Sequence, residues 1–241
     1  HSKRKTFGDM IDRYIEEILP LKPKSQEKQT QQLSYWKEKL GHIILKDVTS
    51  SNIVAIRNEL STGQTPRGIR SPATVNRYLA AISHVYTIAI KEWEWTHDNP
   101  VSRVSKLKES RGRTRFLSDN ERVKLLHACK RSGNKYLYFI VVLALSTGAR
   151  RNEILSMTWQ QIDFKRQIIT LEETKNGEMR MLPLQGYAYD LICELFKHRH
   201  PFTHLLFPSD HGNHKPVDIT KSWERALKKA KIEDFRFHDL R

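Results

Sequence analysis

Hydrophobic residues recur at helical spacing through most of the first hundred positions. The helices that this spacing predicts cover residues 6–19, 25–40, 53–60 and 72–89. The last of them has strong start signals, because Ser71 suits the N-cap and Pro72 the first helical position. No segment of this part alternates with the two-residue period of a strand. We therefore predict an all-α domain over residues 1–102, which Asn99-Pro100 closes.

A polar and basic stretch without a hydrophobic pattern follows at residues 103–115. It includes the cations Lys106, Lys108, Arg111, Arg113 and Arg115. We interpret it as a flexible interdomain linker whose charge would suit contact with a phosphate backbone. A plain solvated linker is the alternative.

The pattern over residues 116–241 returns to helices. Ser118 and Glu121 have the form of a capping box ahead of one helix, and the apolar run 138–145 predicts a buried one. That run ends at Thr147-Gly148, where glycine can turn the backbone, and a new helix starts at once with Arg150 in its first turn. Later helices are expected at residues 188–198 and 222–231.

The hydrophobic period changes between these helices. Residues 167–171 and 179–184 are short β-prone runs, and Asn176-Gly177 between them is a strong turn signal. We expect a hairpin with Lys175 at its tip. The predicted fold class is therefore mainly α with a small β-hairpin or sheet: an all-α N-terminal domain, then an α+β domain over residues 116–241.

Charge and cysteine content narrow the class of protein. The chain of 241 residues has a net charge of +15, of which +6 lies in residues 1–110 and +9 in residues 111–241. A long polyanion held by both halves would explain this excess. No apolar run approaches the ~20 residues that span a bilayer. The two cysteines and scattered histidines have neither disulfide nor metal-ligand spacing, so we expect a cytoplasmic protein without metal or cofactor.

The candidate chemistry begins with Arg150. Glu153 follows three residues later and so lies on nearly the same helix face as Arg150. Ile154 and Leu155 supply the side of the helix that packs inward. An arginine rooted in the core and braced by a carboxylate is a rigidly aimed guanidinium, which suits bidentate contact with a phosphate. An ordinary surface ion pair is the alternative.

Two motifs together carry a family resemblance. The first is Thr147-Gly148-x-Arg150-x-x-Glu153-Ile154-Leu155, with Trp159 and Ile162-Asp163 after it, and the second is His238-Asp239-Leu240-Arg241. In this order and spacing they resemble the tyrosine recombinases of the phage-integrase type. The resemblance spans essentially the whole chain, and it implies a core-binding domain followed by a catalytic domain.

The resemblance also implies a reaction. In this family a tyrosine hydroxyl cleaves DNA, forms a 3′-phosphotyrosyl bond and releases a 5′-hydroxyl without a metal. By this resemblance Arg150 and Arg241 would flank the phosphate oxygens, and Glu153 would orient Arg150. Lys175 would protonate the leaving oxygen, and His238 would assist proton transfer or hold the phosphate.

Other side chains are candidate contacts to double-stranded DNA. These are Thr74 and Arg77 on the 72–89 helix, the linker cations, and Arg151 beside Arg150. A solvated helix face is as good an explanation for Thr74 and Arg77. By the family resemblance, the complete protein would act as a tetramer on DNA, whereas these 241 residues would be monomeric and bind no membrane.

One element of the family pattern does not occur in these residues. The nucleophilic tyrosine should follow the His-x-x-Arg motif, whereas Tyr187 and Tyr189 precede it and match no nucleophile position. We therefore expect the 241 residues to be a catalytically inactive part of a recombinase truncated before its nucleophile. A non-catalytic DNA-binding protein of the same fold is the main alternative, and a type IB topoisomerase or a metal-dependent nuclease fits less well.

Overall fold

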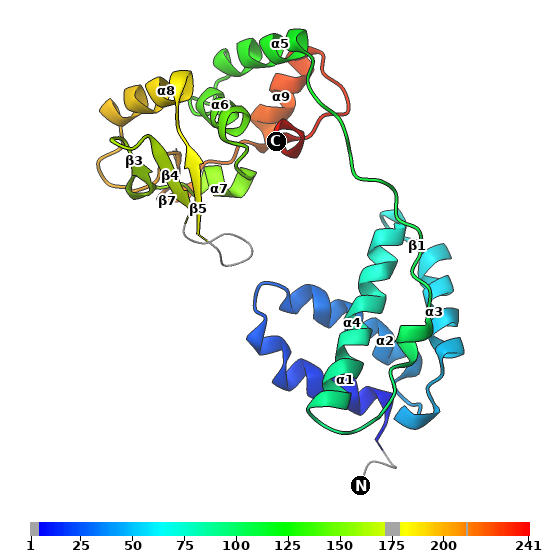
Figure 1. Cartoon of the computed structure of the whole chain (residues 1–241). Helices are drawn as coiled ribbons and strands as arrows, with labels where there is room; N and C mark the ends of the chain where they lie inside the picture. The colour runs from blue at the N-terminus through cyan, green and yellow to red at the C-terminus, as the bar shows by residue number, and fades with distance from the viewer. Residues whose placement is uncertain (1–4, 172–178, 211) are drawn as a thin grey trace. The chain divides into compact units, whose positions relative to one another are not determined.

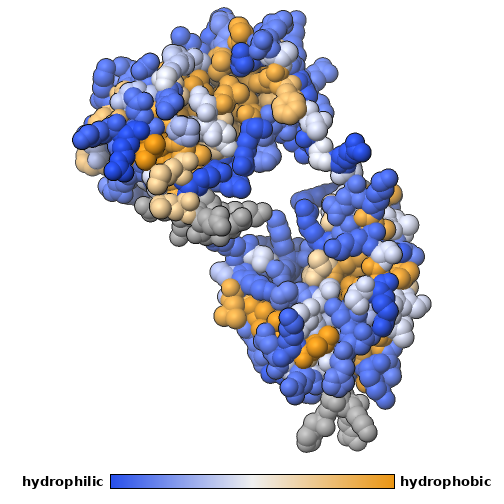
Figure 2. Space-filling model, in the orientation of Figure 1, coloured by the Kyte–Doolittle hydropathy of each residue, from blue (hydrophilic) through white to orange (hydrophobic). Residues whose placement is uncertain are grey.

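The structure, a computed structural model, describes residues 5–171, 179–210 and 212–241. The chain divides into two compact units, His1–Arg111 and Gly112–Arg241 (Figure 1). Hydrophilic residues cover most of the face drawn in Figure 2, and hydrophobic residues appear between them in small groups.

The first unit is a helical domain. Its α-helices are α1 (Phe7–Glu17), α2 (Gln26–Leu40), α3 (Ser50–Thr62) and α4 (Pro72–Lys91), and α4 packs against the other three (Figure 1). Short 3-10 helices occupy Leu19–Leu21, Leu45–Asp47 and Pro100–Arg103. Trp36 is fully buried in this core and donates its indole N–H to the carbonyl of Tyr78, 3.0 Å away. The N-cap of α4 is Ser71, as its sequence predicts.

The prediction that the first domain contains no strand is wrong in one detail. Residues 61–70 include a small antiparallel hairpin of β1 (Gln64–Thr65) and β2 (Gly68–Ile69). Gly68 has a positive φ of 89°, which a glycine adopts without steric cost, and the Thr65 hydroxyl donates to its carbonyl. Strands of two residues are too short to show an alternating pattern in the sequence.

The segment predicted as a linker is held at both ends. Asn76, which is buried in α4, exchanges two hydrogen bonds with the backbone of Leu107 at 2.9 Å each. Beyond the boundary between the units, Arg113 and Arg115 bind carboxylates of the second unit. The segment therefore carries specific contacts that its unpatterned sequence does not reveal.

The second unit surrounds a hydrophobic helix. Its α-helices are α5 (Asp119–Lys130), α6 (Leu137–Thr147), α7 (Arg151–Leu155), α8 (Gly186–Lys197) and α9 (Thr220–Ala230). The buried helix α6 packs against α5, α7 and α8, and α5 packs against α9. Short 3-10 helices form at Trp159–Gln161 and Phe237–Leu240.

Two small antiparallel sheets complete this unit. The first has the order β3 (Ile162–Asp163), β4 (Ile168–Leu171) and β5 (Arg180–Pro183), and the second pairs β6 (Pro208–Ser209) with β7 (Gly212–Pro216). The hairpin expected from residues 167–171 and 179–184 corresponds to β4 and β5, whereas the β6–β7 pair was not predicted. The expected fold class, mainly α with small sheets, is confirmed.

Candidate active site

Gly148 forms the turn on which the site is built. It caps α6 with a left-handed backbone conformation, φ 62° and ψ 20°. The Thr147 hydroxyl supports the turn by donating to the carbonyl of Leu143 and accepting from the N–H of Ala149. The turn therefore ends α6 and presents Arg150 at the start of α7 two residues later.

Arg150 is the N-cap residue of α7, with an extended backbone, and not part of its first turn as we predicted. The Glu153 carboxylate accepts its backbone N–H at Oε2 and its guanidinium Nη1 at Oε1, each at 2.7 Å. The carboxylate thus satisfies one free N–H at the helix start and also fixes the arginine side chain. The predicted i,i+3 pair is present, but its geometry is that of a cap.

The environment of Glu153 keeps it ionised. Burial alone would raise its pKa, because the side chain is only 12% exposed. The backbone and side-chain hydrogen bonds from Arg150 and the charges of Arg180 and Arg150 outweigh this, so the pKa of Glu153 is lowered. Glu153 is therefore a permanent anion between two arginines at neutral pH.

Arg180 is the second of these arginines and was missed in the sequence. It lies at the start of β5, and its Nη2 lies 2.8 Å from Glu153 Oε2. A signal was available, because Arg180 is two residues before the inward-facing Leu182 in the same strand. Alternation predicts that Arg180 points to the core side, where a charge needs a partner.

The His-x-x-Arg motif forms the 3-10 helix Phe237–Leu240. Phe237 and Leu240 are buried, and the Phe237 ring packs edge-on against Trp223 of α9. Because Phe237 and Leu240 anchor the helix to the core, His238 between them is exposed. Arg241, directly after the helix, is also exposed.

The two motifs meet at the Gly148 turn. A Cβ atom built on Gly148 would lie 3.8 Å from the Cγ of Arg241. Arg241 thus packs against the turn that delivers Arg150, although 91 positions separate them along the chain. A cavity of about 540 Å³ adjoins this point. Its lining residues are Arg113, Arg115, Phe116, Arg236, His238, Asp239 and Arg241.

Comparison with known proteins identifies the family. A model described as "Phage integrase family" matches residues 115–241, and one described as "Phage integrase, N-terminal domain" matches residues 4–108. The chain belongs to the phage integrase family. The resemblance to tyrosine recombinases that its two motifs carry is confirmed.

Relatives and solved structures agree with this assignment. A shufflon-specific DNA recombinase of Escherichia coli is 33% identical over 82% of the chain and 50% of its own length. The integrase of Salmonella phage P22 is 27% identical over 98% of the chain and 67% of its own length. The chain thus spans about half of the first relative and two thirds of the second.

Solved integrases share the fold. A lambda integrase dimer bound to a COC′ core site matches with a TM-score of 0.74 at 20% identity, covering 99% of this chain and 69% of that one. The Tn1549 transposon integrase in complex with circular intermediate DNA matches with a TM-score of 0.73 at 18% identity, covering 98% and 84%.

The cations predicted to contact DNA have varied surroundings in this integrase-family chain. Arg113 donates from Nη1 to Asp234 at 2.8 Å and from Nη2 to Asp239 at 2.9 Å, and Arg115 pairs with Glu121. Arg151 donates to the Thr220 hydroxyl at 3.0 Å. These contacts are internal to the second unit, so a DNA role for these three stays a prediction.

The remaining candidates lie in the first unit or outside the described residues. Arg77, Lys106, Lys108 and Arg111 are exposed. The Thr74 hydroxyl shares a 3.0 Å hydrogen bond with Ser71 at the start of α4. Lys175, predicted at the tip of the β4–β5 hairpin, lies outside the described residues.

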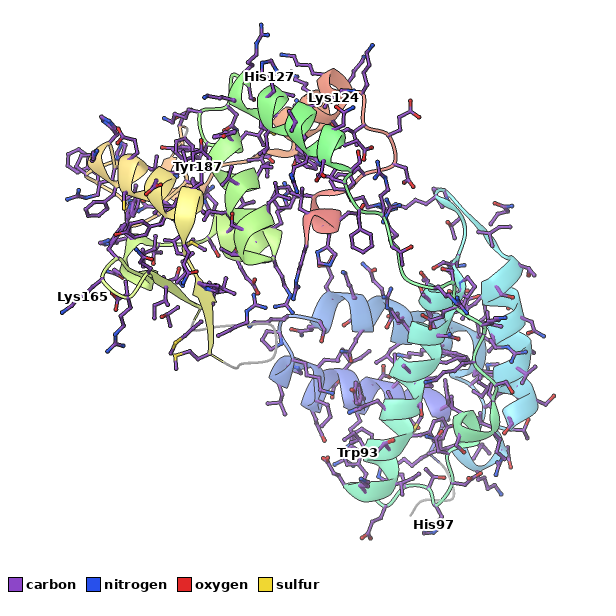
Figure 3. The ribbon with its side chains drawn as sticks, turned by 45° about the horizontal axis from the view of Figure 1, so that its top comes forward. Trp93, His97, Lys124, His127, Lys165 and Tyr187 are labelled. Atoms are coloured by element: carbon purple, nitrogen blue, oxygen red, sulfur yellow. The ribbon has the colours of Figure 1, made fainter. Side chains whose placement is uncertain are left out.

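The tyrosines of the second unit have partners away from the site. The hydroxyls of Tyr138 and Tyr187 lie 3.0 Å apart, and Tyr187 is at the start of α8 (Figure 3). Tyr189 donates to the carbonyl of Phe164 at 3.3 Å. Within the described part of the chain, no tyrosine hydroxyl has a hydrogen bond to Arg150, His238 or Arg241.

Three further features concern metal ligands, membrane spans and a buried thiol. Residues 5–171, 179–210 and 212–241 contain no group of three metal-ligating side chains, and none of their helices is long and apolar enough to cross a membrane. Burial raises the pKa of the Cys129 thiol to about 12, so it stays protonated and unreactive at neutral pH.

Proposed function

We propose that the chain forms the core-binding and catalytic body of a site-specific recombinase that cleaves and rejoins double-stranded DNA through a 3′-phosphotyrosyl intermediate. The observation that carries this proposal is the contact of the Arg241 side chain with the Gly148 turn, because that turn also presents Arg150 at the start of α7. Two arginines can hold the non-bridging oxygens of one phosphate, each through paired hydrogen bonds.

The charge of the site fits a phosphoryl transition state. Arg150 uses Nη1 for Glu153 in the described structure, which leaves further guanidinium N–H groups to bind oxygen atoms of a substrate. Arg241 and His238 are exposed beside a cavity lined mainly by cationic residues. Fixed cationic donors of this kind stabilise the extra negative charge of a pentacovalent phosphorus without reorganisation.

The remaining roles follow from the family resemblance. Lys175 would protonate the 5′ oxygen as it leaves, and His238 would assist proton transfer or hold the phosphate. Glu153 would orient Arg150 without touching the DNA. The N-terminal unit, the segment 103–115 and Arg151 would contact the DNA backbone.

The relatives also suggest the assembly. One solved lambda integrase is described as a tetramer bound to a Holliday junction, and it matches the chain with a TM-score of 0.75. We propose the same assembly for the complete protein on DNA, and a monomer for these 241 residues free in solution.

The test is covalent trapping on a nicked duplex that bears the attachment site. Protein from the complete reading frame is expected to form an adduct that survives a denaturing gel. Arg150→Ala should slow its formation by about 10²–10³-fold, the usual cost of losing one transition-state donor. DNA binding that is tight and salt-sensitive, with no adduct on any site tried, would favour a non-catalytic DNA-binding protein instead.

The 241-residue chain provides a second arm of this test. It should bind the duplex without forming an adduct, because its tyrosines neither follow His238 in sequence nor hydrogen-bond to the site. An adduct formed by this polypeptide would contradict this prediction, and peptide mapping would identify the tyrosine involved.

A further inference from the structure

The strand register places Arg180 on the core side of the sheet. In the β4–β5 pair, Arg180 is opposite Leu171 and Leu182 is opposite Ile169. Leu171, Leu182 and Ile169 are all at least 94% buried, whereas Met181 between them is 58% exposed on the other face. Arg180 is therefore a cation at an inward-facing position, where an unpaired charge would be costly.

Glu153 is the partner that accepts this cation. Its Oε2 receives Arg180 Nη2 at 2.8 Å and the backbone N–H of Arg150 at 2.7 Å, so two donors fix one oxygen. The other oxygen, Oε1, is then directed to Arg150 Nη1. The carboxylate cannot rotate about its last bond without breaking contacts to both arginines.

The same contact sets the net charge of the cluster. Arg150 and Glu153 alone would be a neutral pair, which attracts a phosphate weakly. Arg180 adds a second cation, so the three side chains carry one net positive charge. At the short distances and partial burial of this site, one added positive charge strengthens the attraction for a phosphate.

We infer that Arg180 is a positioning residue for phosphate binding at Arg150, acting through Glu153. This inference rests on the proposed function, in which Arg150 binds the scissile phosphate. Arg180 ties the sheet to the start of α7, so the aim of the Arg150 guanidinium depends on where β5 lies. The side-chain Nε of Arg180 is buried and has no acceptor among the described residues. Its orientation is thus set by the contact of Nη2 with Glu153.

The first experiment measures phosphate binding without catalysis. The 241-residue chain is titrated with inorganic phosphate, and the side-chain Nε–H resonance of Arg150 is followed by NMR at neutral pH. Arg180→Gln is expected to weaken binding at Arg150 by about tenfold, and Arg180→Lys, which keeps the charge but not the planar donor pair, by less. Arg166→Gln is the matched control, because Arg166 follows the same sheet's β3 but is 77% exposed.

The second experiment measures cleavage at saturating DNA by protein from the complete reading frame. Arg180→Gln should slow adduct formation by about 10–100-fold, as expected for a misaimed group, with duplex affinity changed less than threefold. In a Glu153→Gln background the same substitution should have little further effect, because both residues act on Arg150 by one route. Additive losses in the double variant would overturn the assignment.

The outcomes separate this inference from the proposed function. If no variant forms an adduct but phosphate affinity at Arg150 still depends on Arg180, the proposed function fails and the positioning role stands. If adducts form and Arg180→Gln matches Arg166→Gln in both measurements, the positioning role fails and the function stands. Thermal unfolding of each variant shows whether a loss of phosphate affinity or of adduct formation reflects an unfolded protein. If Arg180→Gln is unfolded, the same two measurements on Arg180→Lys test the positioning role.

Discussion

At the scale of single residues, Glu153 makes the stability of the second unit depend on pH in a defined direction. Its pKa is lowered in the folded protein, so its contribution is fully present above the ordinary glutamate value of 4.5. The contribution is lost as the pH falls through the lowered folded-state pKa. Glu153→Gln should therefore reduce the free energy of unfolding at pH 7 by about 1–3 kcal/mol, because two cations lose a charged partner.

The measurement is urea unfolding of the wild type and Glu153→Gln across the range from pH 7 to pH 3. The gap between their midpoints should narrow only below about pH 4.5. Glu224→Gln, at an exposed position of α9, is the control and should behave like the wild type. A gap of constant size over the whole range would contradict the ionised pair.

The contacts of these residues also show which parts of the site could be predicted from the sequence. The pairing of Arg150 with Glu153 was predictable, because a spacing of three residues at the start of a helix decides it locally, as in a capping box. The contact of Arg180 with the same carboxylate was not, since it depends on how the sheet packs against α7. The contact of Arg241 with Gly148 also depends on the three-dimensional path of the chain. At the level of the sequence, only the family resemblance connects the two motifs.

At the scale of elements, the turn between α6 and α7 depends on glycine at position 148. Its φ of 62° is in the left-handed region, which costs a residue with a Cβ about 1–2 kcal/mol. Gly148→Ala should lower the unfolding free energy by about that amount, and the cost should come from the backbone, because the new methyl group would lie at an ordinary contact distance of 3.8 Å from the Cγ of Arg241.

The check is thermal unfolding of Gly148→Ala beside Gly133→Ala. A Cβ at Gly133 meets no atom within 4 Å, and Gly133 lacks a positive φ, so this control should be near neutral. Equal effects of the two substitutions would mean that the conformation of Gly148 is not what constrains the turn.

The 3-10 helix that carries His238 is a second element, and the ion pairs that stabilise it were not predicted from the sequence. Arg113 binds Asp239 and Asp234 from a stretch that we interpreted as a flexible interdomain linker. Burial alone would raise the pKa of Asp239, but its hydrogen bonds to Arg113 and to the backbone of Arg236 lower it. Arg113→Ala should release this helix and speed hydrogen exchange of the amides at residues 237–241 by about tenfold or more.

The matched control for this prediction is Arg111→Ala. Arg111 is exposed and two residues away, in the other unit, so its loss should leave these amides unchanged. Unchanged exchange in Arg113→Ala itself would show that Phe237 and Leu240 hold the helix without the ion pairs.

At the scale of the whole molecule, the net charge of +15 predicts that the DNA binding we propose depends strongly on salt. Each phosphate that a cation neutralises releases counterions, so the logarithm of the binding constant should fall steeply and linearly with the logarithm of salt concentration. Because both halves of the sequence carry excess positive charge, cations of both units should contribute to this slope.

Arg77 offers a direct test of how much the first unit contributes to the salt dependence of DNA binding. It is exposed on α4, and we expect it to neutralise one phosphate, so Arg77→Gln should reduce the slope of the salt dependence by about 0.9. Lys46→Gln, which removes an exposed charge from the Leu45–Asp47 helix, should leave the slope unchanged. Fluorescence anisotropy of a labelled duplex over a salt series measures both. If the two variants lower the slope equally, binding depends on overall charge and not on a defined face of α4.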